Sequence, residues 1–120
     1  NIQWIFMNYI QNEPPIFHKI YEFIVWIYPT INKFPKSQRF VLGQRMENVV
    51  LDILELLIEA KLSKIRISFL QKSSVKLDKL RILMRLTKDL KFISVKEYEF
   101  GCKQIDEIGR MLGGWIKSLS

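Results

Sequence analysis

Apolar side chains recur along this chain at the three- and four-residue spacing of amphipathic helices. The first such series occupies residues 16–31 and follows Pro14 and Pro15, a favourable pair for the start of a helix. Its members are Ile16, Phe17, Ile20, Phe23, Ile24, Ile27 and Ile31. Pro29 lies inside the series and is expected to kink the helix or shorten its regular part, because proline lacks an amide proton.

A second helix is predicted over residues 38–61. Residues 33–36 (KFPK) interrupt the first apolar series, and Ser37 is suited to cap the N-terminus of the new helix through its hydroxyl. The apolar positions of this helix are Val41, Leu42, Val49, Ile53, Leu56, Leu57 and Ala60. Residues 62–69 have a weaker pattern, which favours a loop with one helical turn.

Two further helices complete the pattern. The third is predicted over residues 70–91, and its apolar face consists of Ile82, Leu83, Leu86 and Leu90. The fourth begins at the capping-box sequence of residues 94–97 (SVKE) and extends to about Lys117. No segment alternates with the period of two that is typical of strands. The sequence therefore predicts an all-α fold, an antiparallel up-down-up-down four-helix bundle.

The first two helices are more apolar than one buried face requires. The first adds three aromatic residues to its aliphatic series: Tyr21, Trp26 and Tyr28. The second confines its polar residues to one narrow arc: Asn48, Asp52, Glu55 and Glu59. Two apolar faces per helix favour contacts between subunits, since monomers rarely leave large apolar patches in water. The alternative is a thick core within a monomer.

The length of 120 residues fits one domain. We expect the bundle over residues 14–120, preceded by an N-terminal extension over residues 1–13. The chain does not begin with Met, and Met7 is a candidate start, so residues 1–6 are expected to be upstream or vector-encoded. The apolar run at residues 4–7 is too short to span a bilayer. No membrane partner is expected.

The sequence has few cysteine or histidine residues that could act as nucleophiles or metal ligands. A single cysteine, Cys102, cannot form an internal disulfide and favours a reducing, cytoplasmic setting. With one histidine, His18, a structural zinc site with four N/S ligands is not expected. His18 and Glu22, one turn apart, are expected to pair at the surface. Phosphate-binding glycine loops and acid–base dyads do not occur. The sequence therefore predicts no catalytic residues, metal or cofactor.

The positive charge is concentrated in one stretch. Residues 61–91 hold ten Lys/Arg and two Asp, a net charge of +8 in a chain whose total is +7. Such a surface attracts polyanions, of which nucleic acid is the commonest. The candidate binding residues here are Lys72, Lys76, Lys79, Arg81, Arg85, Lys88 and Lys91. Arg81, Arg85 and Lys88 are expected on the side of the helix opposite its apolar face.

Other candidates lie outside this stretch. The fourth helix has a basic residue at every seventh position: Lys96, Lys103, Arg110 and Lys117. Of these, Lys103 and Arg110 are further candidates for nucleic-acid binding, although nearby acidic residues offer ordinary pairs within the helix as an alternative. Lys36 and Arg39 are candidates in the connection between the first two helices. A capped turn that fixes the angle between those helices is the alternative interpretation there.

Four segments carry a recognisable pattern. They are residues 15–23 (PIFHKIYEF), 28–40 (YPTINKFPKSQRF), 80–91 (LRILMRLTKDLK) and 109–116 (GRMLGGWI). Together they resemble the accessory variability determinant (Avd) family of diversity-generating retroelements. The chain is also similar to a broader family of small four-helix bundle proteins encoded in intervening sequences of bacterial large-subunit ribosomal RNA genes. Residues 1–13 and 61–75 depart from the pattern.

The resemblance implies a bundle that assembles into a basic homopentameric barrel, binds nucleic acid and associates with the reverse transcriptase of its element. That complex copies a template RNA into cDNA with errors at adenines, and the cDNA replaces a variable region of a target gene. The accessory protein itself is not an enzyme in this scheme. The expected partners are therefore RNA or DNA, the reverse transcriptase and further copies of the chain.

Two alternatives keep the fold and change the function. One is a ribosomal intervening-sequence protein that binds RNA. The other is a protein-only adaptor whose basic face docks an acidic partner. Salt distinguishes the adaptor, because binding to phosphates weakens steeply between about 50 and 200 mM salt.

Overall fold

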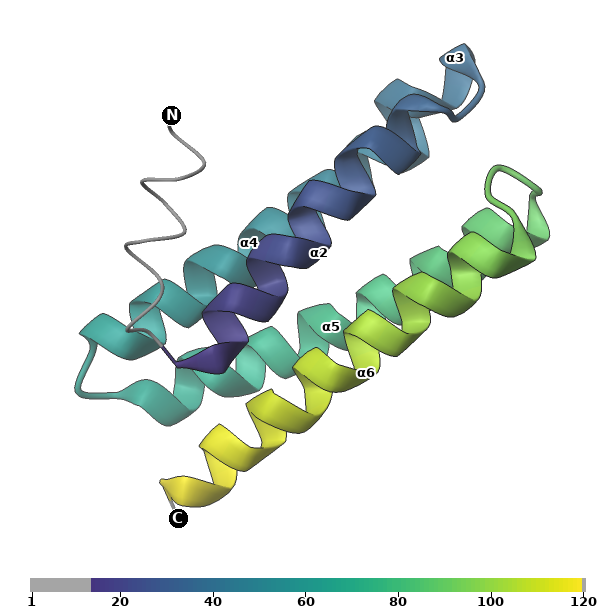
Figure 1. Cartoon of the computed structure of the whole chain (residues 1–120). Coiled ribbons are helices and arrows are strands. Elements are labelled where there is room, and N and C mark those ends of the chain that lie inside the picture. The colour runs from purple at the N-terminus through teal and green to yellow at the C-terminus, as the bar shows by residue number, and fades with distance from the viewer. Residues whose placement is uncertain (1–13, 120) are drawn as a thin grey trace, which may run out of the picture.

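The computed structural model describes residues 14–119, which form a four-helix bundle (Figure 1). Its long helices are α2 (Pro15–Asn32), α4 (Gln44–Leu62), α5 (Arg66–Asp89) and α6 (Val95–Ser118). Two short segments precede α4: α3 (Lys36–Gln38) and the π-helical turn η1 (Arg39–Gly43). Within residues 14–119 every regular element is helical, which confirms the predicted fold class. The extension predicted over residues 1–13 lies outside the described residues.

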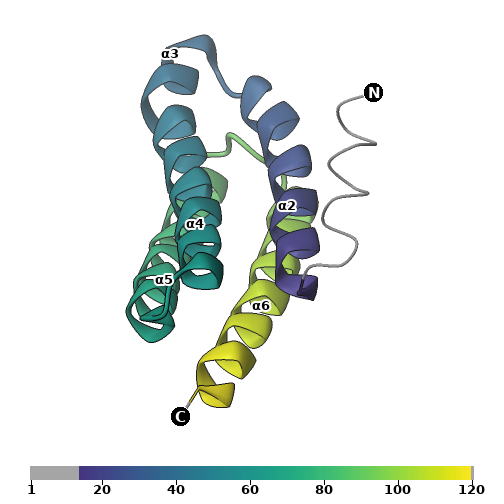
Figure 2. The same ribbon diagram turned by 90° about the vertical axis from the view of Figure 1, so that its left-hand side faces the viewer.

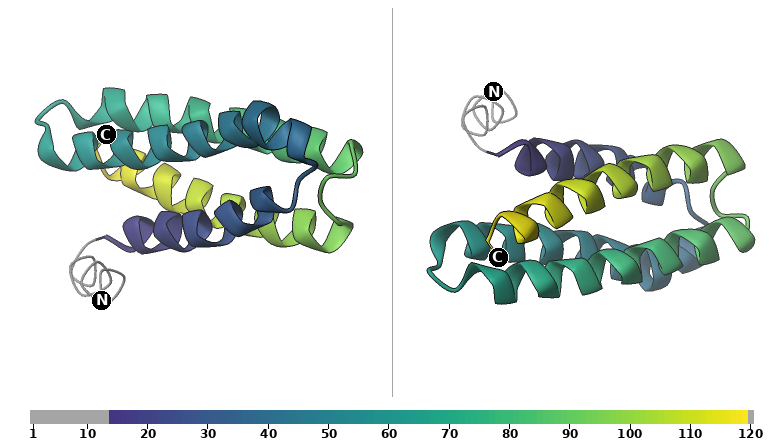
Figure 3. Two further views of the ribbon diagram at one scale, coloured as in Figure 1. Left: turned by 90° about the horizontal axis from the view of Figure 1, so that it is seen from above. Right: turned by 90° about the horizontal axis from the view of Figure 1, so that it is seen from below.

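Consecutive long helices run in opposite directions, because short connections join them. Figure 2 shows α4 between α5 and α2, and α2 in turn packs against α6. The bundle therefore forms two layers, with α4 and α5 in one and α2 and α6 in the other (Figure 3). This is the predicted up-down-up-down arrangement.

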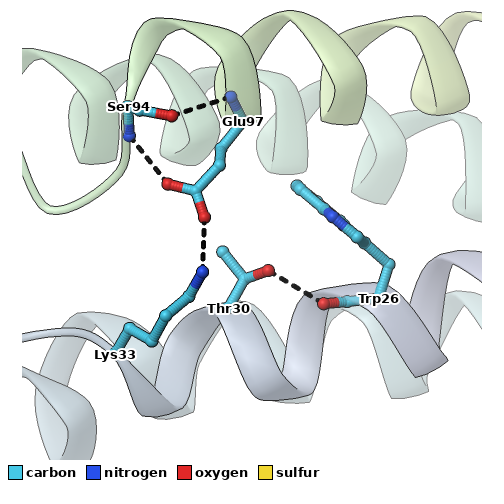
Figure 4. A network of polar contacts seen from close by, with 5 residues as sticks. All are labelled: Trp26, Thr30, Lys33, Ser94 and Glu97. Carbon is cyan, nitrogen blue, oxygen red and sulfur yellow. Dashed lines mark hydrogen bonds and ion pairs between the residues drawn. The ribbon is translucent and has the colours of Figure 1, made fainter.

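The apolar series of α2 is confirmed as its core face. All seven of the predicted positions are buried except Ile24, which packs against the core while partly exposed. Pro29 does not shorten the regular part of α2, which continues to Asn32. One turn beyond Trp26, the Thr30 hydroxyl donates a hydrogen bond of 2.9 Å to the Trp26 carbonyl (Figure 4). Residues 28–32, the first part of the 28–40 segment, therefore continue α2 without a break.

The start of the predicted second helix was wrong at Ser37. Helical structure begins one residue earlier, at Lys36, and no side chain caps it. The Pro35 carbonyl instead accepts backbone hydrogen bonds from Gln38 at 2.8 Å and Arg39 at 3.2 Å. Because proline fixes its own φ near the value that precedes a helical turn, Pro35 sets this start without a capping hydroxyl.

The π-helical turn η1 also changes which residues are buried. A π turn holds one more residue than an α turn and so shifts the side chains that follow. As a result Val41, predicted as a core position, is 63% exposed, while Leu42 and Gly43 are buried. The turn packs tightly on α2, since a Cβ atom at Gly43 would lie 2.6 Å from Cγ2 of Ile31. A glycine is required at this close approach.

The connection between α4 and α5 is shorter than the predicted loop over residues 62–69. Only residues 63–65 separate the two helices. The Ser63 hydroxyl accepts a hydrogen bond of 3.0 Å from the backbone N–H of Ile65, and the Ser63 carbonyl accepts one of 3.2 Å from Arg66. These local bonds turn the chain within three residues. The extra turn of α5, residues 66–69, brings Phe69 against the core.

The largest difference concerns the side of α5 that faces the core. Three residues of the predicted apolar face are exposed, Ile82 by 70%, Leu86 by 43% and Leu90 by 48%. The buried positions of α5 are Leu70, Ser73, Leu77, Leu80, Met84 and Thr87. Of the predicted face, Leu83 alone packs against the core. The helix is therefore rotated about its axis relative to the prediction.

Two hydroxyl residues account for this error. Ser73 and Thr87 are buried, and each donates to the carbonyl four residues earlier, at 3.0 Å and 2.7 Å respectively. Such back-bonding satisfies a hydroxyl inside a core without a partner on another helix. Thr87 also contacts the sulfur of Met46 on α4 at 3.3 Å. A periodicity argument that counts only apolar residues misses both positions.

The start of α6 is as predicted. Ser94 accepts a hydrogen bond from the Glu97 backbone N–H at 3.0 Å, and the Glu97 carboxylate accepts one from the Ser94 N–H at 2.9 Å. This capping box extends to α2, because Lys33 donates to the same carboxylate at 2.8 Å (Figure 4). The hydrogen bond from Lys33 lowers the pKa of Glu97, with the Ser94 backbone contributing.

Candidate nucleic-acid interface

The rotation of α5 distributes its basic residues over two faces of the bundle. Arg81 and Lys88 reach side chains of α6, and Arg85 lies close enough to influence Tyr98 of that helix. Lys76 instead pairs with Asp52 of α4. We define the α5/α6 face as Arg81, Arg85, Lys88, Lys103 and Arg110. We define the α4/α5 face as Lys72, Lys76 and Lys79.

Arg81 lies between α5 and α6. Its guanidinium donates to Asp78 at 2.9 Å and to Asp106 on α6 at 3.4 Å. It also covers Gly109, where a Cβ atom would lie 2.8 Å from Nη2. Arg81 thus serves as a link between the two helices, and both carboxylates offset part of its charge.

The other two cations of α5 on this face are less constrained. The Lys88 ammonium lies 4.6 Å from the centroid of the Tyr98 ring and 3.5 Å from Asp89. The Arg85 Nε lies 3.9 Å from the same aspartate, and the Arg85 side chain is 74% exposed. Arg85 is therefore the cation of α5 on this face most accessible to a phosphate.

The basic row of α6 is confirmed as solvent-facing. Lys96, Lys103, Arg110 and Lys117 are all exposed. Lys103 and Arg110 lie one helical turn on either side of Asp106, which points to Arg81, so they continue the α5/α6 face. The acidic neighbour Glu107 of this row forms an ion pair with α2. Lys19 lies 2.7 Å from Glu107 and is the main reason for the lowered pKa of that carboxyl group.

The α4/α5 face is a groove rather than an open surface. Lys76 pairs with Asp52 at 3.1 Å, and the Lys72 ammonium lies 5.7 Å from the centroid of the Phe69 ring. A hollow of about 340 Å³ opens between Glu55 of α4 and Val75 of α5 beside these lysines. Lys79 is exposed on the same helix. Acidic side chains of α4 thus reduce the local positive charge here.

The remaining candidates lie at one end of the bundle. The connection around α3 and the turn between α5 and α6 lie together at that end (Figure 1). Lys36 is exposed, whereas Arg39 is partly buried and donates to the Phe34 carbonyl at 3.4 Å within the same connection. Lys91 ends α5 in the left-handed backbone region, with φ of 65°, and its own N–H bonds to the Lys88 carbonyl. Its backbone conformation gives Lys91 a structural role in the turn.

Sequence reasoning missed a group of residues around η1. Phe40 is 73% exposed and stands between two hollows that also share Gln44 and Asn48, and Arg45 lines the larger one. The two hollows measure about 430 Å³ and 350 Å³. Since Phe40 precedes a helix in which apolar residues are common, its sequence position alone resembles a core position. Only the π turn directs it outward.

No group of three His, Cys, Asp or Glu side chains within residues 14–119 is placed to hold a metal ion. Cys102 is a partly exposed free thiol, and its hydrogen bond with Tyr98 raises the pKa of that phenol. The predicted surface pair of His18 and Glu22 is confirmed, with Nε2 and Oε1 2.8 Å apart. None of the helices in this range is long and apolar enough to cross a membrane.

The comparisons with known proteins agree with the Avd resemblance. The chain matches the family described as bAvd-like over residues 16–119, which includes all four long helices except the first residue of α2. The search of curated proteins found no match. A family match over so much of the chain decides membership, and the chain belongs to the bAvd-like family.

Proposed function

We propose that this protein is a non-enzymatic accessory protein of a diversity-generating retroelement. It binds the template RNA or the cDNA through its basic surface and associates with the reverse transcriptase during mutagenic retrohoming. Membership of the bAvd-like family supports the retroelement context. The observation that carries the binding proposal is the α5/α6 face, where two adjacent helices present Arg85, Lys103 and Arg110 to solvent.

The mechanism is electrostatic. Cations that lie along parallel or antiparallel helices neutralise successive phosphates and release their counterions. Such contacts position a nucleic acid without reading its sequence, which suits a protein that presents a template to a polymerase. Because Arg81 is held by two carboxylates, Arg85 and the α6 row supply most of the binding.

We further propose that the chain works as a homo-oligomer, a pentamer as the family resemblance implies. The outer side of α5 carries Val75, Ile82 and Leu86 with 56%, 70% and 43% of their surface exposed. Monomers rarely leave such a series in water, and burying it against a second copy removes it from solvent. A ring of subunits would also combine the positive charge of the basic faces of its members.

The binding proposal is tested by removing charge from the α5/α6 face. Arg85→Gln with Arg110→Gln leaves the ion pairs of Arg81 intact and takes away two exposed cations. We expect the slope of log affinity against log salt to fall by about 2 for a duplex RNA–DNA probe. The measurement is a fluorescence anisotropy titration between about 50 and 200 mM salt.

A matched control removes the same charge elsewhere in the basic stretch. Lys61→Gln with Lys64→Gln changes the turn between α4 and α5, away from the α5/α6 face. We expect a smaller change in slope from this control than from the arginine pair. Equal effects would mean that net charge, and not this face, governs binding.

Association with the reverse transcriptase requires a separate experiment. The tagged chain is co-purified with the reverse transcriptase encoded beside it, in moderate salt and after nuclease treatment. We expect a complex that survives the nuclease, since the proposal includes a protein contact. A chain that retains RNA but loses the polymerase under these conditions would contradict this part of the proposal.

A further inference from the structure

The π turn η1 presents an aromatic ring in a polar setting. Phe40 is 73% exposed although Leu42 and Gly43 beside it are buried. It borders both the 430 Å³ and the 350 Å³ hollow, and these share Gln44 and Asn48 as well. The Phe40 ring therefore separates two neighbouring hollows along α4.

The groups around Phe40 are amides, cations and two carboxylates. The carboxylates are Glu47 at the smaller hollow and Asp52 at the larger one, where Asp52 pairs with Lys76 at 3.1 Å. Gln44 and Asn48 are exposed amides one helical turn apart on α4, and each offers both a donor and an acceptor. Arg45 and Lys76 line the larger hollow, and Arg39 lines the smaller one. An apolar helix docked here would have to desolvate all of these groups, which is costly. Three cations against two carboxylates leave a net positive charge here, which matches a flat ligand with polar edges and a phosphate nearby.

A third hollow extends this path. The 340 Å³ groove of the α4/α5 face shares Asp52 and Lys76 with the larger hollow at Phe40. The three hollows thus follow one another along α4, from Tyr28 at one end to Lys72 at the other. Lys72 and Lys76 line this groove together with Asp52 and Glu55, so its lining carries no net charge and the positive charge lies nearer to Phe40.

We propose that Phe40 is a stacking platform for one unpaired base of a single-stranded nucleic acid. The base lies on the exposed ring, Gln44 and Asn48 hydrogen-bond its edge, and Arg45 holds an adjoining phosphate. Stacking of a base on an aromatic ring tolerates any sequence, because every base has a flat face. This inference rests on the proposed nucleic-acid binding, and it adds a site distinct from the α5/α6 face.

The test compares two single-stranded probes that differ only in their bases. One is an oligouridylate of about 12 nucleotides, and the other has the same backbone with abasic sites throughout. We expect Phe40→Leu to weaken binding of the uridylate about 5- to 150-fold and to leave binding of the abasic strand unchanged. Phe40→Tyr, which keeps the ring, should bind both probes like the wild type.

The matched control is Val41→Ala, since Val41 is 63% exposed beside Phe40 but has no ring. We expect it to bind both probes like the wild type. Circular dichroism and sedimentation are recorded for every variant. Because Phe40 lies outside the core, unchanged helicity is expected in Phe40→Leu.

The outcomes separate this inference from the proposed function. If the wild type binds both probes and Phe40→Leu binds them equally well, the stacking site is wrong while nucleic-acid binding remains. If Phe40→Leu weakens both probes alike and changes the sedimentation coefficient, Phe40 is a subunit contact and the inference is overturned. If the wild type binds neither strand nor a duplex, the proposed function fails, and this inference with it.

Discussion

The helices α5 and α6 are equally long, 24 residues each, yet they begin in different ways. A complete capping box starts α6, and two ion pairs with α2 hold it, Lys33 with Glu97 and Lys19 with Glu107. By contrast, α5 begins without a side-chain cap at Ile65. Two ion pairs also join α5 to its neighbours, Lys76 with Asp52 of α4 and Arg81 with Asp106 of α6. The helix α5 therefore differs from α6 in lacking a cap and not in lacking ion pairs.

The two helices also divide their apolar residues differently. On α6 the buried positions and the basic row occupy opposite sides, as an amphipathic helix requires. On α5, Ser73 and Thr87 take core positions while Ile82 and Leu86 remain outside. Apolar side chains of α5 therefore remain exposed although hydroxyl side chains occupy core positions. The exposed apolar residues of α5 are the series that the proposed oligomer would bury.

The largest expected effect tests the rotation of α5. Leu80→Ala should lower the free energy of unfolding by about 2–5 kcal/mol, because Leu80 is fully buried and truncation leaves a cavity. In the dissociated monomer, Ile82→Ala, two residues away, should change it by less than about 0.5 kcal/mol, since Ile82 is 70% exposed in the single chain. Urea denaturation monitored by circular dichroism measures both.

A large loss at Ile82 has two distinguishable meanings. If the loss depends on protein concentration, Ile82 lies in a subunit contact, as proposed for the homo-oligomer. If the loss is the same at every concentration, the predicted face of α5 is the buried one, and the rotation described above is wrong.

A smaller effect is expected at the start of α6. Ser94→Ala removes the acceptor for the Glu97 N–H and should lower the free energy of unfolding by about 1 kcal/mol. Ser118→Ala, in the last turn of the same helix, is the matched control and should change it by less than about 0.5 kcal/mol. Equal losses from Ser94→Ala and Ser118→Ala would show that the capping box does not stabilise the start of α6, and α5 and α6 would then not differ in this respect.

The smallest effect concerns pH. Lys33 lowers the pKa of Glu97 in the folded protein, so the unfolded chain binds that proton more readily. The stabilisation is therefore present above the ordinary glutamate pKa of 4.5 and is lost as the pH falls through the lowered folded value. Lys33→Met should be less stable than the wild type at neutral pH, by about 0.2–1 kcal/mol for such an exposed pair.

In acid the difference between Lys33→Met and the wild type should disappear. Lys79→Met, which removes an exposed lysine from α5, is the matched control. Urea denaturation of the three proteins at neutral and acidic pH tests the prediction. A difference that persists below the lowered pKa of Glu97 would show that Lys33 stabilises the fold by packing and not by charge.

The candidate site was predicted in part. The concentration of charge and the outward row of α6 follow from composition and a seven-residue repeat, both of which are local properties. The pairing of Arg81 with Asp106 could not be foreseen, because it joins residues on two helices whose rotation was unknown. Phe40 was missed for a similar reason. Its exposure depends on η1, and a π turn has no signature in the spacing of apolar residues.

The sequence alone determined the four helices, the capping box of α6 and the stretch that carries the charge. These features are set by neighbouring residues, through periodicity, capping hydrogen bonds and the backbone limits of proline. Only the tertiary structure decided which side of α5 faces inward and where Phe40 points. Both depend on how the four helices fit together. The Thr87 hydroxyl is accepted in the core because it bonds the Leu83 carbonyl and contacts Met46, and η1 is held close to Ile31 at Gly43.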